Sequence, residues 1–299
     1  MSLFDRLVDE AMHNQQGLVP LRVVVEKELL HHDILREMSS SGLLAGLTFM
    51  GGTCLRACYG STRLSEDLDF SGGCDFNRGD LSLLAQVLIE QLQRKYGLLV
   101  EISEPVRETG NVDTWKLKLR TRPDQPDLPV QRINIDICAV PSHEPRPMML
   151  RSHYGVDMGT SGLILQAQSR EEILADKFIA LALRPNRLKN RDLWDITWLH
   201  QNGIELTMAL LPLKLHDHHC DTQHFLDLLT KRRQALLGDR QLHDDFRKEM
   251  QRFLPVAVTA ETVEQPMFWE YLTSLIDQQC RRISDYLISS NPSVPSFRV

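Results

Sequence analysis

Asp67 and Asp69 lie two residues apart, after a glycine-rich turn, in the segment FMGGTCLRACYGSTRLSEDLDFSGG (residues 49–73). In a strand both carboxylates would point to one face, while Leu68 and Phe70 would point to the core. Two carboxylates this close repel each other unless a cation lies between them. Mg²⁺ prefers hard oxygen ligands and is often bound by one or two carboxylates together with substrate phosphates. The pair therefore predicts a site for a metal ion.

The turn ahead of this pair supplies the other half of such a site. The apolar run from Leu47 ends at Gly51 and Gly52, which predicts a buried strand followed by a tight turn. Thr53 is predicted to cap a helix that extends through Tyr59. Backbone N–H groups at a helix N-terminus bind anions, so the turn and the carboxylates together predict a site for a metal–nucleotide complex.

Each of these motifs alone has an ordinary explanation. A D-x-D pair is more often a solvated strand end than a metal site, and a Gly-Gly pair is usually just a turn. Their joint occurrence in strand–turn–helix–strand order favours the functional interpretation. This order does not by itself identify the reaction.

Two later segments alternate with a period of two. In RINIDIC (residues 132–138) Asp136 shares a face with Asn134, and in WKLKLRTR (residues 115–122) every second residue is basic. Both patterns predict half-buried strands, with a hairpin-like connection over the Pro-rich residues 123–129. Asp136 thus offers a third carboxylate, and three carboxylates on adjacent strands suit a pair of catalytic metal ions.

Both strands and helices are needed to position these residues. The spacing of apolar residues predicts strands over 47–50 and 64–71 and helices over 3–12, 20–38, 81–96, 171–183 and 191–201, with three or four helices beyond. Gly97 is predicted to end the helix over residues 81–96. No strand is expected after Ser169.

Composition limits the class of protein. The chain has 299 residues, 42% hydrophobic and 25% charged, which is enough for one large domain or two ordinary ones. A net charge of −6 excludes a protein that coats nucleic acid by bulk charge, although local basic patches remain available. The six cysteines include no C-x-x-C pair. No signal-peptide core and no stretch of membrane-helix length occur, so a cytoplasmic location without membrane attachment is expected.

Five motifs follow one another along the chain: EKE at 26–28, GGTxLR at 51–56, RxSxDxDF at 63–70, EExxAxK at 171–177 and RDLxD at 191–195. Together they resemble the AbiEii/AbiGii-type nucleotidyltransferase toxins, of which the MenT toxins are relatives. These are the toxins of type IV bacterial toxin–antitoxin and phage-defence systems. The resemblance spans about residues 23–200. It departs from the family pattern at Cys54, where a small aliphatic residue is commoner, and at Glu28, which replaces an aspartate.

The resemblance implies an α+β fold: a polymerase-β-like nucleotidyltransferase core, with a mixed sheet and helices, joined to an α-helical C-terminal domain. The expected division is residues 1–46 as N-terminal helices on the core, 47–165 as the core and 166–299 as the helical domain.

Site residues follow by matching position. The resemblance implies catalytic roles for Asp67, Asp69, Lys177 and Asp192, and nucleotide binding by Gly52, Thr53 and Lys177. Gly51 in the same turn, and Arg63 and Ser65 where the loop enters the second strand, complete the candidate nucleotide-binding set. The expected metal is Mg²⁺, or alternatively Mn²⁺, held by Asp67, Asp69 and, by fold analogy and strand alternation, Asp136.

The residues themselves leave alternatives open. Lys177 lies beside an apolar helix stripe, where its charge would suit a triphosphate or would simply reach the surface. Asp192 and Asp195 share a helix face and form either a base or orienting pair or a first turn favoured by the helix dipole. Arg63 and Ser65 either meet the phosphates or stabilise their loop.

Two further clusters of side chains have compositions that could suit binding. The basic run Arg184, Arg187, Lys189 and Arg191, with the basic strand face at 116–122, would hold an RNA backbone or form a solvated surface. The histidine-rich stretch from His216 to His224 lacks the spacing of a structural zinc site, which favours a polar helix junction.

We therefore expect an Mg²⁺-dependent nucleotidyltransferase toxin that transfers NMP from an NTP to an RNA such as the tRNA 3′ end. By resemblance, a cognate antitoxin would be its protein partner. Two alternatives remain: a phosphotransferase that uses the same cleft to modify a protein hydroxyl, and a non-catalytic module that binds a nucleotide or a partner.

Overall fold

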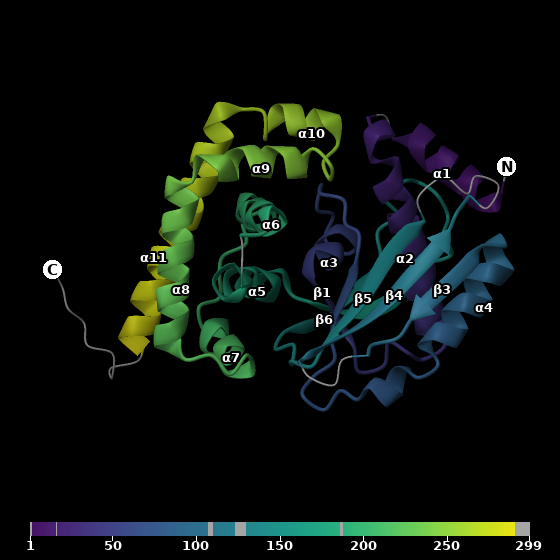
Figure 1. Cartoon of the computed structure of the whole chain (residues 1–299), viewed down its shortest axis with the longest axis horizontal. Helices are drawn as coiled ribbons and strands as arrows, with labels where there is room; N and C mark the ends of the chain where they lie inside the picture. The colour runs from purple at the N-terminus through teal and green to yellow at the C-terminus, as the bar shows by residue number, and fades with distance from the viewer. Residues whose placement is uncertain (1, 16, 107–109, 123–129, 186–187, 291–299) are drawn as a thin grey trace. The chain divides into compact units, whose positions relative to one another are not determined.

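The computed structural model describes the chain except for residues 1, 16, 107–109, 123–129, 186–187 and 291–299 (Figure 1). The predicted connection over 123–129 and the basic residue Arg187 therefore lie outside the described residues. The chain divides into two compact units, Met1–Gln168 with Phe253–Val256, and Ser169–Arg252 with Ala257–Val299. The division expected at residues 46/47 and 165/166 stays a prediction.

The first unit is built on a mixed seven-stranded sheet in the order β3-β4-β5-β2-β1-β7-β6 (Figure 1). Strands β2 and β5, and β1 and β7, pair in parallel, whereas the other neighbours are antiparallel. The strands are β1 (Thr48–Met50), β2 (Leu68–Ser71), β3 (Leu99–Ser103), β4 (Val112–Arg120), β5 (Gln131–Cys138), β6 (Pro145–Met149) and β7 (Ile164–Gln168). The predicted α+β class is confirmed.

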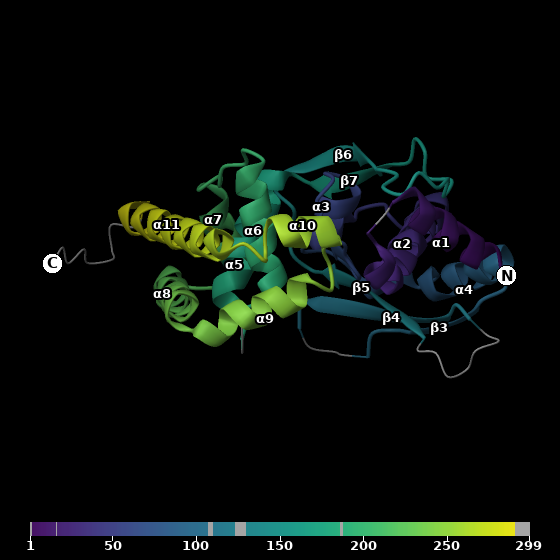
Figure 2. The ribbon, with the colours of Figure 1, turned by 90° about the horizontal axis from the view of Figure 1, so that it is seen from above.

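Helices α1 (Leu3–Asn14), α2 (Arg22–Ser40) and α4 (Leu84–Tyr96) lie on one side of strands β3 to β5 (Figures 1 and 2). Short 3-10 helices, Val19–Leu21 and Arg78–Leu81, precede α2 and α4, and α3 (Gly51–Ala57) follows β1. As predicted, α4 ends at Gly97, whose φ of 67° is readily adopted only by glycine. The alternate residues of β5, Ile133, Ile135 and Ile137, are buried in the core.

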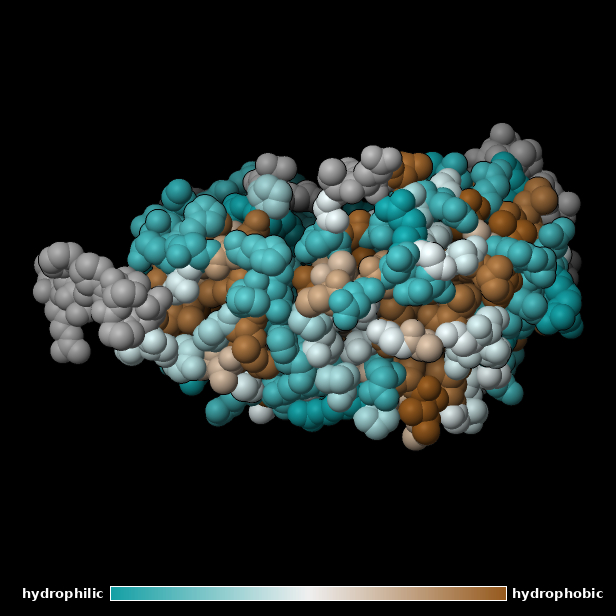
Figure 3. All heavy atoms as spheres, turned by 90° about the horizontal axis from the view of Figure 1, so that it is seen from below, coloured by the Kyte–Doolittle hydropathy of each residue, from teal (hydrophilic) through white to brown (hydrophobic). Residues whose placement is uncertain are grey.

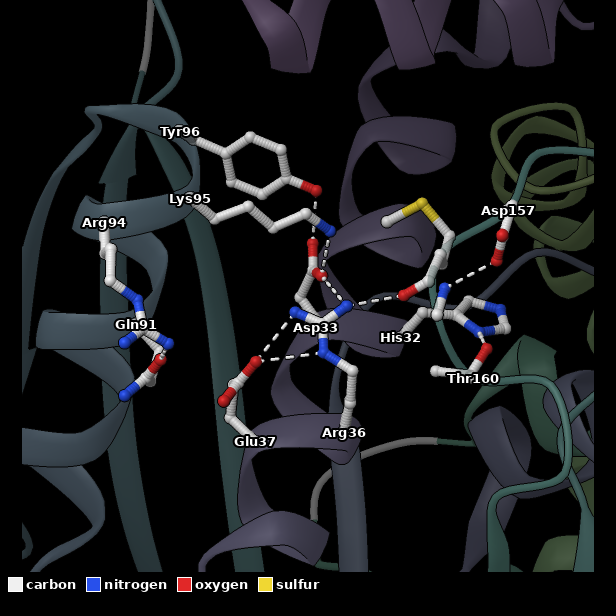
Figure 4. A network of polar contacts seen from close by, with 12 residues as sticks. His32, Asp33, Arg36, Glu37, Gln91, Arg94, Lys95, Tyr96, Asp157 and Thr160 are labelled. Atoms are coloured by element: carbon white, nitrogen blue, oxygen red, sulfur yellow. Dashed lines mark hydrogen bonds and ion pairs between the residues drawn. The ribbon is translucent and has the colours of Figure 1, made fainter.

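A buried carboxylate joins the two long helices of this layer. Asp33 on α2 is fully buried and pairs with Lys95 Nζ at 2.5 Å and with Arg36 Nη1 at 2.8 Å. Tyr96 on α4 donates its hydroxyl to the other carboxylate oxygen at 2.5 Å, and Figure 4 shows these groups converging on Asp33. Burial and the neighbouring Asp33 raise the pKa of Tyr96, so the phenol remains a donor. The helical layer is thus fixed by charge as well as by apolar packing.

Two expectations about the central segment are wrong. The second strand begins at Leu68 rather than at residue 64, because Arg63 and Ser65 are buried in a loop and the Leu64 N–H donates to Phe253 O at 2.8 Å instead of to a strand. Thr53 is not an N-cap: α3 begins at Gly51, and the Thr53 hydroxyl instead donates to Ser65 Oγ at 2.7 Å. Both differences arise because this loop packs onto α3 through its polar groups.

Three strands were missed by the sequence patterns. Strands β3 and β6 are the two edges of the sheet, and β6 carries Pro145 and Pro147, which an edge strand tolerates. In strand β7 the apolar Ile164 is exposed and the polar Gln168 is buried, so hydropathy does not follow burial there.

The second unit contains helices and, within the described residues, no strand, as expected. The helices are α5 (Arg170–Leu183), α6 (Asn190–Gln201), α7 (Leu210–Asp217), α8 (Thr222–Gly238), α9 (Arg240–Met250), α10 (Val256–Glu261), whose first residue belongs to the first unit, and α11 (Pro266–Ser290). Five helices follow α6, one or two more than predicted. Ser169 caps α5 by accepting a hydrogen bond from the Glu172 N–H at 3.0 Å.

The surface carries both polar and apolar side chains. Figure 3 shows the two kinds interspersed on one face. Val19, Val106 and Met267 are among the most exposed large apolar residues. No helix in the described part of the chain is long and apolar enough to span a membrane. The cysteines are all free thiols.

Candidate active site

Asp69 and Asp136 lie side by side in the middle of the sheet. Strands β2 and β5 run in parallel, and their register places Asp69 directly opposite Asp136. Neighbouring strands are about 4.8 Å apart, so the two carboxylates project from the same face of the sheet. Both side chains are half-buried, whereas their neighbours Phe70 and Ile135 are fully buried on the other face. The sheet therefore presents two adjacent carboxylates on one face.

The glycine turn touches this pair. Met50, the last residue of β1, is paired with Asp69, and the chain turns at Gly51 with a φ of 74°. A Cβ atom on Gly51 would lie 2.8 Å from Asp69 Oδ2. Residue 51 must therefore be glycine for two reasons, its backbone conformation and the closeness of the Asp69 carboxylate. The predicted juxtaposition of the turn and a D-x-D carboxylate is confirmed for Asp69.

Asp67 has a different environment from Asp69. It precedes β2, and its Oδ1 accepts a hydrogen bond from the Asn134 N–H at 3.0 Å, which fastens the loop to β5. In the part of the chain that the structure describes, no three His, Cys, Asp or Glu side chains gather closely enough to hold a metal ion by themselves. The three-carboxylate metal site stays a prediction. Asp69 and Asp136 offer the hard oxygen donors that Mg²⁺ takes when substrate phosphates complete its coordination, so the donor set fits that ion.

The other predicted nucleotide-binding side chains of the first unit are buried. Thr53, Arg63 and Ser65 are at most 5% exposed. The Thr53 hydroxyl contacts both Ser65 Oγ and the Asp67 carbonyl, and Arg63 Nη1 donates to Leu64 O at 2.9 Å. These contacts favour the second of the two alternatives, in which the residues stabilise the loop that carries Asp67.

A buried glutamate on α2 holds this loop in place. Glu28 on α2 accepts a hydrogen bond from the Ser65 N–H at 2.8 Å and pairs with Arg56 Nε at 3.1 Å. The Tyr154 hydroxyl also donates to Glu28, and Arg56 Nη1 donates to Ser61 O at 2.9 Å. Burial opposes the charge of Glu28, but Arg56, Tyr154 and Ser65 together hold its pKa below the ordinary value. Helix α3, the loop and α2 are thus tied together through one carboxylate.

Two histidines beside this network are held neutral. His32 contacts Thr160 Oγ1 through Nδ1 at 2.9 Å, and His153 contacts the Arg56 carbonyl through Nε2 at 2.7 Å. Burial lowers the pKa of His32 to about 4, and burial together with the Arg56 charge lowers the pKa of His153 to about 4. A proton on either ring would place a charge in this interior.

The neutral histidines predict loss of stability in weak acid. The unfolded chain binds a proton on His32 below its ordinary pKa of 6.5, whereas the folded chain does so only near 4. The stabilisation is therefore complete above pH 6.5 and is lost as the pH falls toward 4. Between pH 7.5 and pH 5 we expect His32 to remove about 2 kcal/mol from the unfolding free energy. Urea unfolding at the two pH values measures the drop, which should be smaller by that amount in His32→Asn. An equal drop in the variant would contradict the assignment.

In the second unit, Lys177 on α5 is held between two aspartates of α6. Its Nζ lies 2.7 Å from Asp192 Oδ1 and 2.8 Å from Asp195 Oδ2. Asp195 is fully buried and Asp192 is 3% exposed. Arg184 Nη1 pairs with the second oxygen of Asp192 at 2.7 Å. The predicted common face of the two aspartates is confirmed, and it serves to fix the lysine.

The charges around Asp192 decide which role it can take. Burial opposes its ionisation, but Lys177, Arg184 and Lys189 together lower its pKa below the ordinary range. A carboxylate that holds its charge so firmly is a weak base. The orienting role, rather than the base, is therefore the alternative that the geometry favours.

The structure places the candidate residues in two groups. Gly51, Gly52, Thr53, Arg63, Ser65, Asp67, Asp69 and Asp136 belong to the first unit, and Lys177 and Asp192 belong to the second. Sequence reasoning missed Tyr154 and Arg184 as partners of the site residues. Arg184 belonged to the predicted basic run, whereas nothing in the sequence around Tyr154 pointed to Glu28.

The histidine-rich stretch is a helix junction, as predicted. Asp221 accepts a hydrogen bond from the His224 N–H at 3.0 Å and caps α8. His219 adopts a φ of 50° in the turn between α7 and α8.

The sequence and the fold were compared with those of known proteins. The family model "Nucleotidyl transferase AbiEii toxin, Type IV TA system" matches residues 33–274. The structure is similar to that of MenT4, a nucleotidyltransferase toxin from Mycobacterium tuberculosis H37Rv, with a TM-score of 0.53 and 14% identity over 96% of this chain and 98% of that chain. JHP933 from Helicobacter pylori matches with a TM-score of 0.44 and 18% identity over 88% of this chain and 97% of that chain. No curated protein sequence matches significantly. At 14% identity the similarity to MenT4 concerns the fold alone.

Proposed function

Because the chain belongs to the AbiEii family of nucleotidyltransferase toxins from type IV toxin–antitoxin systems, we propose that it transfers a nucleoside monophosphate from an NTP to an RNA acceptor such as the 3′ end of a tRNA. Mg²⁺ is the proposed cofactor, with Mn²⁺ as the alternative. The observation that carries the proposal is the pair Asp69 and Asp136, opposite each other on parallel strands, with the Gly51 turn against Asp69.

The chemistry is an in-line displacement. The acceptor hydroxyl oxygen forms a bond to the α-phosphorus of the NTP, the bond from that phosphorus to the β-phosphate oxygen breaks, and pyrophosphate and the hydroxyl proton are released. A bound Mg²⁺ would stabilise the charge on the phosphates and favour deprotonation of the acceptor hydroxyl.

Each residue of the chain has a physical task in this proposal. Asp69 and Asp136 would hold the metal, which would supply positive charge to the phosphates, and the absence of a side chain at Gly51 lets the NTP approach the turn. Asp192 orients Lys177, whose ammonium supplies positive charge to the nucleotide, as the family resemblance implies. These contributions are positioning and electrostatic stabilisation, which need no covalent intermediate on the protein.

The proposed biological setting follows from the family. Modification of an RNA that the cell needs for translation would arrest growth, and a cognate antitoxin would restrain the activity. A role in phage defence is part of the same proposal.

Radiolabel transfer tests the proposal directly. Purified protein, Mg²⁺ and total tRNA are incubated with each α-³²P-labelled NTP in turn, and separately with each γ-³²P-labelled NTP. We expect the α-label to appear on RNA with one preferred NTP and the γ-label to leave as pyrophosphate. Transfer of the γ-label to protein, with no α-label on RNA, would instead establish the phosphotransferase. Nucleotide binding without either transfer would support the non-catalytic module.

A further inference from the structure

The open face of strands β3 to β5 carries a row of cations that begins beside the carboxylate pair. Thr114 on β4 lies opposite Asp136, and the next residues on the same face are Lys116, opposite Asn134, and Lys118, opposite Arg132. Residues two apart on a strand are separated by about 6.7 Å, so the two lysines lie about 7 and 13 Å along the sheet from Asp136. Carboxylates and lysines therefore share one continuous surface.

These cations are not neutralised by the sheet itself. Lys116, Lys118 and Arg132 are all exposed. Lys118 faces Glu101 on β3, but the two charged groups are 4.0 Å apart and 48% and 80% exposed, so water and salt screen their attraction. The opposite face of the same strands is covered by α2 and α4. The lysines are thus available to an anion from outside.

A hollow with a volume of about 530 Å³ adjoins the row. Its walls include Thr114, Lys116 and Lys118, the apolar side chains of Val106 and Val112, and one acidic residue, Glu104. Cationic side chains beside apolar ones offer contacts to both parts of a nucleotide, the phosphate and the faces of the sugar and base.

We propose that Lys116 and Lys118 bind the phosphate groups of the acceptor RNA, whose single-stranded 3′ end runs along β4 and ends at Asp69 and Asp136. This inference rests on the proposed function, because it assigns the acceptor of the same reaction to a surface. The lysine spacing is comparable to that of successive phosphates in an extended strand. The contacts are to the backbone, so they set affinity and register and do not read the sequence.

The test is the double variant Lys116→Gln/Lys118→Gln in the full-length protein. We expect the KM for total tRNA to rise about tenfold and the slope of log affinity against log salt to fall in magnitude by about 1.4, since each lysine that binds a phosphate of a single strand contributes about 0.7. The KM for the NTP and the kcat should stay within about twofold, because metal and nucleotide binding do not use these side chains. The matched control is Lys231→Gln/Lys248→Gln, which removes the same charge from exposed positions on α8 and α9.

Binding is also measured without turnover, by gel shift of labelled tRNA in EDTA. If both double variants bind and use tRNA equally well, the lysines are a solvated face and the inference is wrong, while label transfer by the wild-type protein still supports the proposed function. If the wild-type protein transfers no α-label to RNA, the proposed function fails. In that case weaker tRNA binding by the Lys116/Lys118 variant than by its control would still support the surface, and equal binding would overturn it.

Discussion

Replacing Asp69 with asparagine is expected to reduce nucleotidyl transfer by about 10³-fold, which corresponds to about 4 kcal/mol of lost transition-state stabilisation. Asparagine keeps the size of the side chain beside Gly51 but removes the negative charge that would hold the metal. Because Asp69 is half-buried at the surface of the sheet, the unfolding free energy should change by less than about 1 kcal/mol. The effect should therefore appear in kcat rather than in the amount of folded protein.

The measurement is the initial rate of α-³²P transfer at saturating NTP, with circular dichroism and urea unfolding on the same samples. Asp75→Asn is the matched control, since Asp75 is an exposed aspartate of the same unit, four residues beyond the end of β2. Asp136→Asn should show a loss of the same order, because Asp136 faces Asp69 across the strand pair. A folded Asp69→Asn protein with more than a tenth of the wild-type rate would exclude Asp69 as a metal ligand.

The fold was predictable where side chains alternate or repeat with a clear period. Strand β5 was recognised because Ile133, Ile135 and Ile137 alternate with polar residues, and burial follows that alternation in the structure. The loop over residues 61–67 was not recognised, and its second half was predicted to be part of a strand. The polar residues Arg63 and Ser65 alternate with Leu64 as they would in a strand, but all three are buried. Periodicity reports which side chains are buried, but not whether the backbone pairs with a strand or with a side chain such as Thr53.

The candidate site was predictable to the extent that its residues are close in sequence. The approach of Gly51 to Asp69 follows from two strands that are neighbours in sequence and pair with each other, whereas the sequence predicts the pairing of Asp69 with Asp136 only through fold analogy and strand alternation. The functions of Thr53 and Ser65 were harder to predict. Their hydroxyl groups suit phosphate binding, but the Ser65 N–H donates a hydrogen bond to the buried Glu28, which holds the loop in the interior. Only the tertiary contacts distinguish these two uses of a hydroxyl.

Replacing Lys177 with methionine is expected to lower the unfolding free energy by about 3 kcal/mol, because Asp192 and Asp195 lose the cation that they share in a buried position. Methionine preserves the length of the side chain, so the cost comes mainly from charge. Urea unfolding monitored by circular dichroism measures the loss. Lys214→Met is the matched control: Lys214 is 1% exposed and pairs with Glu172 and Asp176 of the same helix α5, so its removal should destabilise the chain in a similar way.

Stability and catalysis can then be separated by a compensating change. The double variant Lys177→Met/Asp195→Asn removes the lysine cation together with the negative charge of Asp195. We expect much of the lost unfolding free energy to return, since Arg184 still neutralises Asp192. If Lys177 contributes charge to the nucleotide, this stabilised double variant should remain at least about 100-fold less active than the wild-type protein, whereas folded Lys214→Met should be active. Recovery of activity together with stability would show that Lys177 acts only through the packing of α5 against α6. The comparison uses two buried lysines, Lys177 of α5 and Lys214 of α7, to tell a residue that contacts the substrate from one that stabilises the fold.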